Sequence, residues 1–135
     1  IGVVGRIHRL AKAHHEMVAK NLGRFGLTPD EFDVLAALRR TGEPYAMCPR
    51  DLIESMMVRS GTVSHRLAKL EARGLIRRDP DPDDRRSVIA VLEPEGRALV
   101  DQAIESHLAA EEQLLTALGP REREQLTRLL RKLAE

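Results

Sequence analysis

Residues 60–74, SGTVSHRLAKLEARG, decide the fold. The apolar residues of this stretch recur at spacings of four and three: Val63, Leu67 and Leu70. This periodicity predicts an amphipathic helix over Thr62–Arg73 whose apolar stripe packs against a core. Gly74 follows at the position where helices commonly end on a left-handed residue.

A shorter helix is expected just before this one. Cys48-Pro49 places a cap residue before a proline at the first helical position, which predicts a helix ending near Met56 or Met57. A turn at Val58–Gly61 would join it to the next helix. Two helices of this length joined by a tight turn predict a helix-turn-helix.

A hairpin is expected after the second helix. Leu75–Arg78 is compatible with a strand, and the β-branched, apolar run Ser87–Leu92 predicts the returning strand. Residues 79–84, DPDPDD, lie between them and predict a loop, since two prolines and four acids do not form a regular element. A hairpin with such a long tip is a wing.

Two helices are predicted upstream of this region. Apolar residues at helical spacing predict the first over residues 3–23. Residues 28–31, TPDE, form a capping box with proline at the first helical position, and predict a second helix that ends near Gly42. Its buried residues are expected to be Phe32, Leu35 and Leu38. Residues 43–48 predict a connector.

The downstream part is also predicted to be helical. A long helix is expected over residues 94–118, followed by a break at Gly119-Pro120 and a final helix over residues 121–134. Hydrophobic residues make up 42% of the chain and aromatic residues only 2%, so the core must be built from aliphatic side chains. The expected fold is therefore mainly α with a small β-hairpin, in a single domain of 135 residues.

The positive charge is concentrated in one segment. Residues 59–86 carry eight Lys or Arg against five Asp or Glu, whereas residues 93–135 carry six against nine. A basic segment in an otherwise balanced chain predicts a localised surface that binds a polyanion. So few aromatic residues argue against stacking platforms for single-stranded nucleic acid.

Several other classes of protein are excluded or disfavoured by the sequence. One cysteine, Cys48, allows no intrachain disulfide and suits a reducing cytoplasm. No apolar run has the length of a transmembrane helix, and the charged first 20 residues do not form a signal peptide, so we expect a cytoplasmic protein with no membrane partner. The chain begins at Ile1, which suggests that an N-terminal piece is missing. No phosphate loop or nucleophile–base pair is visible, so we expect no enzyme and no cofactor.

The order of these elements resembles the MarR family of winged helix-turn-helix transcription regulators. The resemblance is carried by residues 60–67, 70–76, 79–86 and 92–99. The family's wing signature is an Asp-x-Arg that ends in a Leu-Thr pair; Asp84, Arg86 and Leu92 match it, whereas Glu93 stands where Thr would cap the next helix. The resemblance implies a DNA-binding lobe over residues 28–92.

The second helix of a helix-turn-helix enters the major groove of duplex DNA. Its exposed and flanking positions here offer Ser60, Thr62, Ser64, His65, Arg66 and Lys69. Hydroxyl and guanidinium groups bind phosphates and base edges, and Arg66 or His65 is suited to guanine. We therefore predict that these residues bind DNA.

Arg85 and Arg86 at the wing tip are candidates for a narrow minor groove, whose negative potential attracts arginine. The alternative is that both only neutralise the four acids of the loop. We predict that Asp84 pairs with Arg86 or Arg85 and orients the tip.

The terminal helices are expected to form a homodimer. Long Leu-rich helices do not bury both faces in one small lobe, and the resemblance implies a two-fold dimer through residues 1–24 and 94–135. Two recognition helices would then bind half-sites about 10 bp apart in a pseudo-palindrome. The resemblance also implies a repressor.

A small-molecule effector is the remaining expectation. His14 and His15 would line the crevice between the dimer helices and the lobe, where family members often bind small anionic aromatics. Because neighbours on a helix diverge by about 100°, the pair does not bind one metal ion unaided, and we predict no metal site. Two alternatives stay open: a winged-helix module for protein contacts, and a redox-responsive regulator through Cys48, which lies near Arg50 at a helix start.

Overall fold

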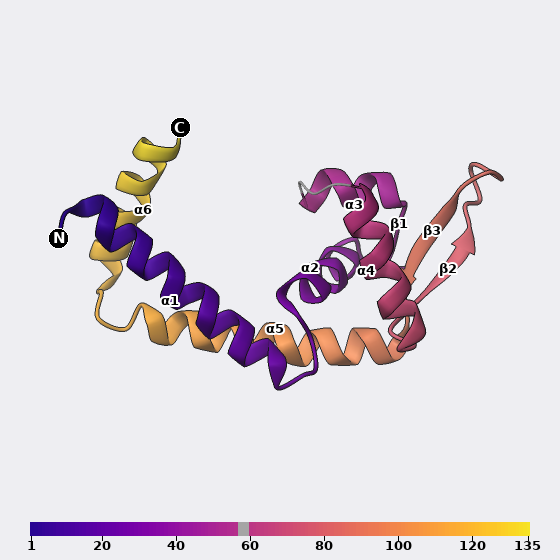
Figure 1. Ribbon diagram of the computed structural model, residues 1–135, viewed down its shortest axis with the longest axis horizontal. Helices are drawn as coiled ribbons and strands as arrows, with labels where there is room; N and C mark the ends of the chain where they lie inside the picture. Colours follow the sequence, from indigo (N-terminus) through magenta and orange to yellow (C-terminus); the bar gives the residue numbers. More distant parts are fainter. Residues whose placement is uncertain (57–59) are drawn as a thin grey trace.

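The computed structural model describes residues 1–56 and 60–135. The helices are α1 (Val3–Gly23), α2 (Pro29–Arg40), α3 (Pro49–Met56), α4 (Ser60–Ala72), α5 (Pro94–Leu114) and α6 (Pro120–Ala134). The strands are β1 (Ala46–Met47), β2 (Ile76–Pro80) and β3 (Val88–Leu92). The predicted mainly α fold with a β-hairpin is confirmed (Figure 1).

Most helix boundaries lie within two residues of their predicted positions. The capping box of α2 is formed: the Glu31 N–H donates to Thr28 Oγ1 and the Thr28 N–H donates to Glu31 Oε1, each at 3.1 Å. Helix α4 begins at Ser60, so Ser60 and Gly61 of the predicted turn Val58–Gly61 belong to this helix, and the other two residues of the turn lie outside the described residues. Gly74 has a φ of +73°, which is the left-handed conformation expected after α4.

The sheet has three strands where only two were predicted. The strand order is β1-β3-β2 and both pairings are antiparallel. Strand β1 lies in the predicted connector, where Ala46 pairs with Val91. Strand β2 continues into the predicted loop, since Asp79 pairs with Ile89 and Pro80 with Val88. Proline is tolerated there because β2 is an edge strand.

We call residues 28–92, from α2 to β3, the lobe. Its core is aliphatic, as the composition predicts, and includes the stripe Val63, Leu67 and Leu70 of α4 at 0%, 2% and 0% exposure. Phe32, Leu35 and Leu38 of α2 are buried beside Leu52 of α3. The lobe therefore holds α4 by its apolar stripe and leaves the opposite face in solvent.

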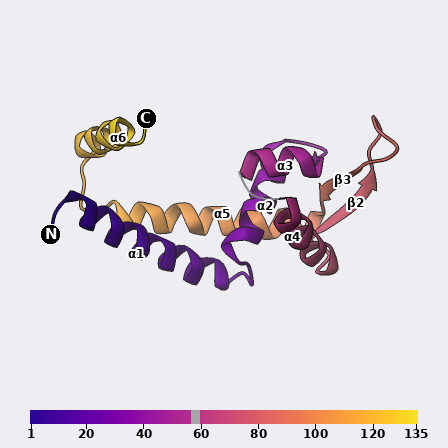
Figure 2. The same cartoon turned by 45° about the horizontal axis from the view of Figure 1, so that its top comes forward.

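We call α1, α5 and α6 the arm. Helix α1 runs beside α5, and α6 stands at the end far from the lobe, close to both chain termini (Figures 1 and 2). No residue of α6 is buried, and large apolar side chains are exposed along the arm: Val3, Val4, Ile7, Leu10, Leu108, Leu129, Leu130 and Leu133. None of the described helices is both long and apolar enough to cross a membrane.

The arm and the lobe join where β3 leads into α5. The Glu93 N–H donates to the Leu75 carbonyl at 3.0 Å. Gly96, in the first turn of α5, lies so close to this carbonyl that a Cβ built on it would overlap the oxygen. Only glycine allows this approach of the α5 backbone to the end of α4.

Candidate DNA-binding surface

The outer face of α4 carries most of the side chains predicted to bind DNA. Thr62, Ser64, His65 and Lys69 are exposed, whereas the apolar stripe of the helix is buried. Ser60 is placed in the first turn of α4. A short row of hydroxyl, imidazole and ammonium groups on a helix of 13 residues is suited to phosphates and base edges in a major groove.

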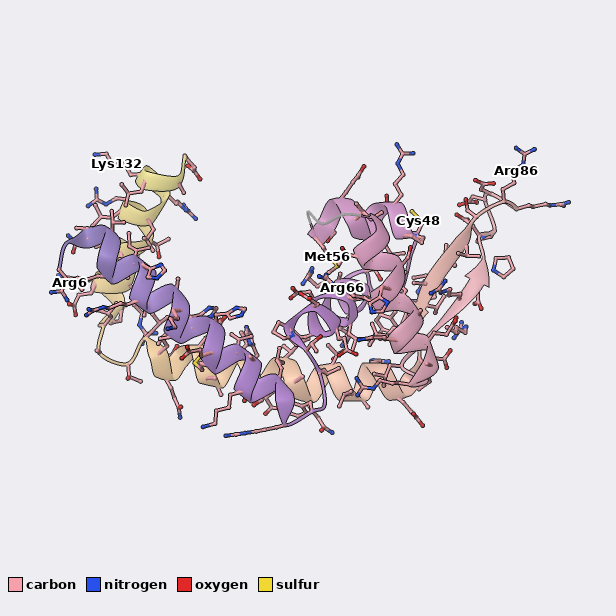
Figure 3. All side chains as sticks on the ribbon, viewed as in Figure 1. Arg6, Cys48, Met56, Arg66, Arg86 and Lys132 are labelled. Carbon is pink, nitrogen blue, oxygen red and sulfur yellow. The ribbon has the colours of Figure 1, made fainter. Side chains whose placement is uncertain are left out.

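Arg66 is placed differently from this row. Its guanidinium lies 2.9 Å from the Asp30 carboxylate of α2, and the side chain is only 12% exposed. Figure 3 shows Arg66 between α4 and α2 rather than at the outer face. Arg66 therefore fixes α4 against α2 and does not present a free guanidinium to bases. Sequence reasoning missed Asp30 because only the fold brings it beside α4.

The tip of the wing carries two exposed arginines, Arg85 and Arg86, and neither forms an ion pair among the described residues. Figure 3 shows Arg86 at the outer end of the hairpin. Asp84 contacts Arg86 through the backbone: its Oδ1 accepts the Arg86 N–H at 3.0 Å, and its Oδ2 accepts the Ser87 hydroxyl at 2.9 Å. These two hydrogen bonds lower the pKa of Asp84. The carboxylate therefore shapes the turn without neutralising a guanidinium.

A second carboxylate of the tip, that of Asp81, also binds the backbone. Asp81 Oδ1 accepts the Asp83 N–H at 2.9 Å, and the Asp81 N–H donates to the Ser87 carbonyl at 3.0 Å. Carboxylates used for Asx-type turns leave the neighbouring arginines free for an external anion. The local structure thus explains how a loop with four acids can present a cationic end.

Most arginines between the wing and α4 are already paired. Arg73 binds Glu31 at 3.0 Å, Arg77 binds both Asp79 and Glu93 at 2.9 Å, and Arg78 lies 3.7 Å from Glu71. The hydrogen bonds that Arg77 donates to Glu93 and to Asp79 raise the pKa of Arg77. The excess of basic residues counted in the sequence therefore overstates the free charge, which is concentrated at Lys69 and the wing tip among the described residues.

His14 and His15 lie in different environments. His14 Nε2 lies 3.5 Å from Glu111 Oε1, while His15 is exposed. The same oxygen of Glu111 lies 2.9 Å from His107 Nε2, and the His107 ring packs on Phe32 with centroids 5.3 Å apart. His107 Nδ1 is buried without a hydrogen-bond partner among the described residues. No local pattern predicts this cluster, because its side chains come from three helices.

Cys48 is half-buried at the start of α3. It lies in a groove of about 470 Å³ between α3 and the wing, together with Arg50, Asp84 and Arg86. Within the described ranges, no set of three His, Cys, Asp or Glu side chains is arranged to hold a metal ion.

Comparison with known proteins gives consistent matches. A model of the MarR family matches residues 25–87. The HTH-type transcriptional regulator PecS of Dickeya dadantii is 36% identical over 128 residues, which span 95% of this chain and 77% of PecS. A structure of Bordetella bronchiseptica BpsR, whose DNA binding is regulated by 6-hydroxynicotinic acid, superposes with a TM-score of 0.82 at 30% identity, covering 99% of this chain and 94% of BpsR.

A mutant of Escherichia coli MarR in complex with operator DNA is also similar. Its TM-score is 0.84 at 25% identity, and the match covers 98% of this chain and 94% of that protein. The agreement extends over both the lobe and the arm. The chain therefore belongs to the MarR family of winged helix-turn-helix, DNA-binding transcription regulators, and is not an enzyme.

Proposed function

We propose that this protein is a homodimeric repressor that binds a pseudo-palindromic operator and is released by a small aromatic or anionic ligand. The observation that carries the proposal is that the chain exposes two separate surfaces suited to other molecules. One is apolar and lies on the arm, and the other is cationic and lies on the lobe. Residues 1–24 and 94–135 would form the dimer, and residues 28–92 would bind DNA.

The dimer is supported by an apolar groove on the arm. The groove has a volume of about 480 Å³ and lies between α1, α5 and α6. Its walls include Ile7, Leu10, Leu114 and Leu130. Apolar surface of this extent on a charged protein favours association with a self-complementary surface, as in a two-fold dimer. The occupant we propose is the same arm of a second copy.

DNA contact is proposed for both free cationic parts of the lobe. Ser60, Thr62, Ser64, His65 and Lys69 of α4 would lie in the major groove, with Arg85 and Arg86 in the adjacent minor groove. Arg66 is reassigned to positioning α4. The polar outer face of α4 disfavours the alternative of a module for protein contacts, which would present an apolar helix.

The ligand is proposed to bind at the crevice between the arm and the lobe. His14 of α1 lies near Glu111 of α5, which contacts His107, and the His107 ring packs on Phe32 of α2. Among the described residues, the buried Nδ1 of His107 has no partner, so it could form one further hydrogen bond. Regulation of BpsR by 6-hydroxynicotinic acid is a precedent in a related protein. A ligand acts only if it binds one separation of the two lobes more tightly than another. Since the proposed target is genomic DNA, we place the protein in the cytoplasm.

The test is selection of bound fragments from genomic duplex, followed by titration of the selected DNA at rising salt. The wild type should select a pseudo-palindrome with half-sites about 10 bp apart. The double variant Arg85→Ala/Arg86→Ala should reduce the slope of log affinity against log salt by about 4, because a dimer loses two arginines from each of its two wings. Lys20→Ala/Arg24→Ala removes the same charge from exposed positions of the arm and should leave the slope unchanged. Failure to enrich any duplex, or an unchanged slope in the wing variant, would contradict the proposal.

A further inference from the structure

We propose that Glu93 is a positioning residue for DNA binding, which acts by holding the wing at the orientation that Arg85 and Arg86 need. Glu93 does so as part of a cluster of three side chains that we call the wing clamp: Arg77, Asp79 and Glu93. This inference rests on the proposed role of the wing in DNA binding.

The wing clamp joins strand β2 to the start of α5. Arg77 Nε binds Asp79 Oδ2 at 2.9 Å, and Arg77 Nη1 binds Glu93 Oε1 at 2.9 Å. One planar guanidinium thus connects two carboxylates with two separate nitrogens, which fixes its orientation better than a single point contact does. Because Ile76 pairs with Leu92 in the sheet, the clamp lies at the base of the wing.

Glu93 occupies the N-cap position of α5 but does not cap it. Its backbone is extended, with φ −77° and ψ 158°, and its side chain accepts no hydrogen bond from the first turn of the helix. A threonine at this position would direct its hydroxyl to the helix. Here the carboxylate points to Arg77 of the neighbouring strand instead. The departure from the family's Leu-Thr pair therefore has a structural counterpart in the wing.

A contact at the base of the wing can determine the orientation of its tip. Strands β2 and β3 run from the clamp to the loop that carries Arg85 and Arg86, and β2 is an edge strand supported on one side only. Any rotation of the base is carried along the hairpin to its tip. A minor groove is narrow, so arginines at the tip enter it only from a restricted direction.

Because Glu93 is negatively charged, a positioning role and a purely electrostatic effect predict opposite changes in DNA binding when the charge is removed. Removing a negative charge from a DNA-binding protein strengthens its attraction to phosphates. If Glu93 acts through the wing clamp, Glu93→Gln has the opposite effect on specific DNA and weakens binding. The matched control is Glu95→Gln, which removes the same charge two residues further along α5, where Glu95 is exposed and forms no ion pair among the described residues.

The experiment measures the affinity of each variant for the selected operator and for a random duplex of equal length. Glu93→Gln should bind the operator about fivefold more weakly, as expected for the loss of an exposed ion pair. Its affinity for the random duplex should equal that of Glu95→Gln. If Glu93→Gln binds the operator as tightly as Glu95→Gln, or more tightly, the inference is wrong.

A second arm of the experiment asks whether the effect passes through the wing. In the Arg85→Ala/Arg86→Ala background, Glu93→Gln should have no further effect on operator affinity, because coupled residues give non-additive changes. An undiminished fivefold loss in that background would overturn the inference. So would a parallel loss of operator and random-duplex binding together with a lowered Tm, since that indicates a purely structural role. If the wild type itself binds no duplex, the proposed function fails, and not this inference alone.

Discussion

The lobe and the arm use the same kinds of residue to different ends. Leu35 and Leu70 in the lobe are fully buried, whereas Leu130 and Leu133 on α6 are 45% and 70% exposed. Each helix of the lobe has its apolar stripe covered by another element of the same chain. The stripe of α6 is covered only in part: Leu126 is half-buried, whereas Leu129, Leu130 and Leu133 are exposed. The helices of the lobe thus bury their apolar residues in a core that also includes Leu22, Val100 and Ala103 of the arm, while the arm exposes an apolar surface that we propose a second copy covers.

The arginines of the lobe also fall into two groups, which differ in whether a carboxylate of the same chain binds them. Arg66, Arg73 and Arg77 are held by carboxylates of the same chain, and they stabilise the arrangement of α4 and the wing. Arg85 and Arg86 have no such partner among the described residues. In both cases we propose that the side chains without a partner among the described residues form a surface for another molecule: apolar on the arm, and cationic at the tip of the lobe.

The largest expected effect comes from blocking the arm. Leu10→Glu/Leu130→Glu places two carboxylates in the apolar groove, and burying them in a dimer would be strongly unfavourable. The variant should be a monomer by sedimentation at micromolar concentration. Its operator affinity should fall by at least about 100-fold, because bivalent binding is lost. Gln125→Glu, at an exposed position of α6, is the control. A variant that still sediments as a dimer would refute our assignment of the groove.

The next largest effect is expected from a cavity in the lobe, which lowers stability more than the same kind of truncation on the arm does. Leu70→Ala should lower the free energy of unfolding by about 2–5 kcal/mol, measured by urea denaturation. In the monomeric background, Leu133→Ala should change it by less than about 0.5 kcal/mol, since that side chain is already exposed. Equal losses at the two positions would mean that the arm folds onto itself after all.

Substitution of Asp84 tests whether hydrogen bonds within the turn determine the conformation of the wing tip. Asp84→Ala should weaken operator binding several-fold although it removes a negative charge, because the turn that presents Arg86 loses two hydrogen bonds. Asp83→Ala removes the same charge from a side chain without a hydrogen bond among the described residues, and should bind equally or more tightly. The pKa of Asp84 lies below its ordinary value of 3.8, so its contribution persists at neutral pH and is lost only as the pH falls through that lowered pKa. A gain of affinity in Asp84→Ala would rule out this role.

The smallest effect is expected at Asp33 on α2. Partial burial, and then the nearby charge of Asp30, raise the pKa of Asp33. The charged form therefore destabilises the fold as the pH rises above 3.8. Asp33→Asn should raise the free energy of unfolding at pH 7 by about 0.5 kcal/mol or less, since solvent still screens this partly exposed side chain. The difference should vanish below pH 3.8, and a destabilised variant at pH 7 would contradict the expectation.

The sequence predicted the elements whose signals are local. The TPDE capping box located the start of α2, and the spacing of Val63, Leu67 and Leu70 located the buried face of α4. Strand β1 was missed because a segment of two residues has no periodicity, and it exists only through its pairing with β3. Proline signals in residues 79–84 ended β2 too early, since they do not reveal that an edge strand tolerates Pro80.

The site was predictable as a surface but not as a set of contacts. Which α4 residues face solvent follows from helical periodicity alone. That Arg66 is held by Asp30 depends on how α4 crosses α2, and these residues are 36 positions apart. That Asp84 binds a backbone N–H instead of a guanidinium depends on the turn it creates. Long-range pairing and turn geometry are properties of the folded chain, so a linear pattern does not contain them.

The close approach of Gly96 to Leu75 affects the length of operator that the proposed dimer can bind. About 18 residues of α5 lie beyond Gly96 and extend for about 27 Å. Tilting α5 by about 5° to admit one methyl group would move its far end by roughly 2 Å, and by roughly twice that between the lobes of the proposed dimer. This exceeds the rise of one base pair, about 3.4 Å. If the dimer forms as we propose, the absence of a side chain at Gly96 sets the distance between its two lobes, and Gly96→Ala is expected to change that distance and the length of operator that fits it.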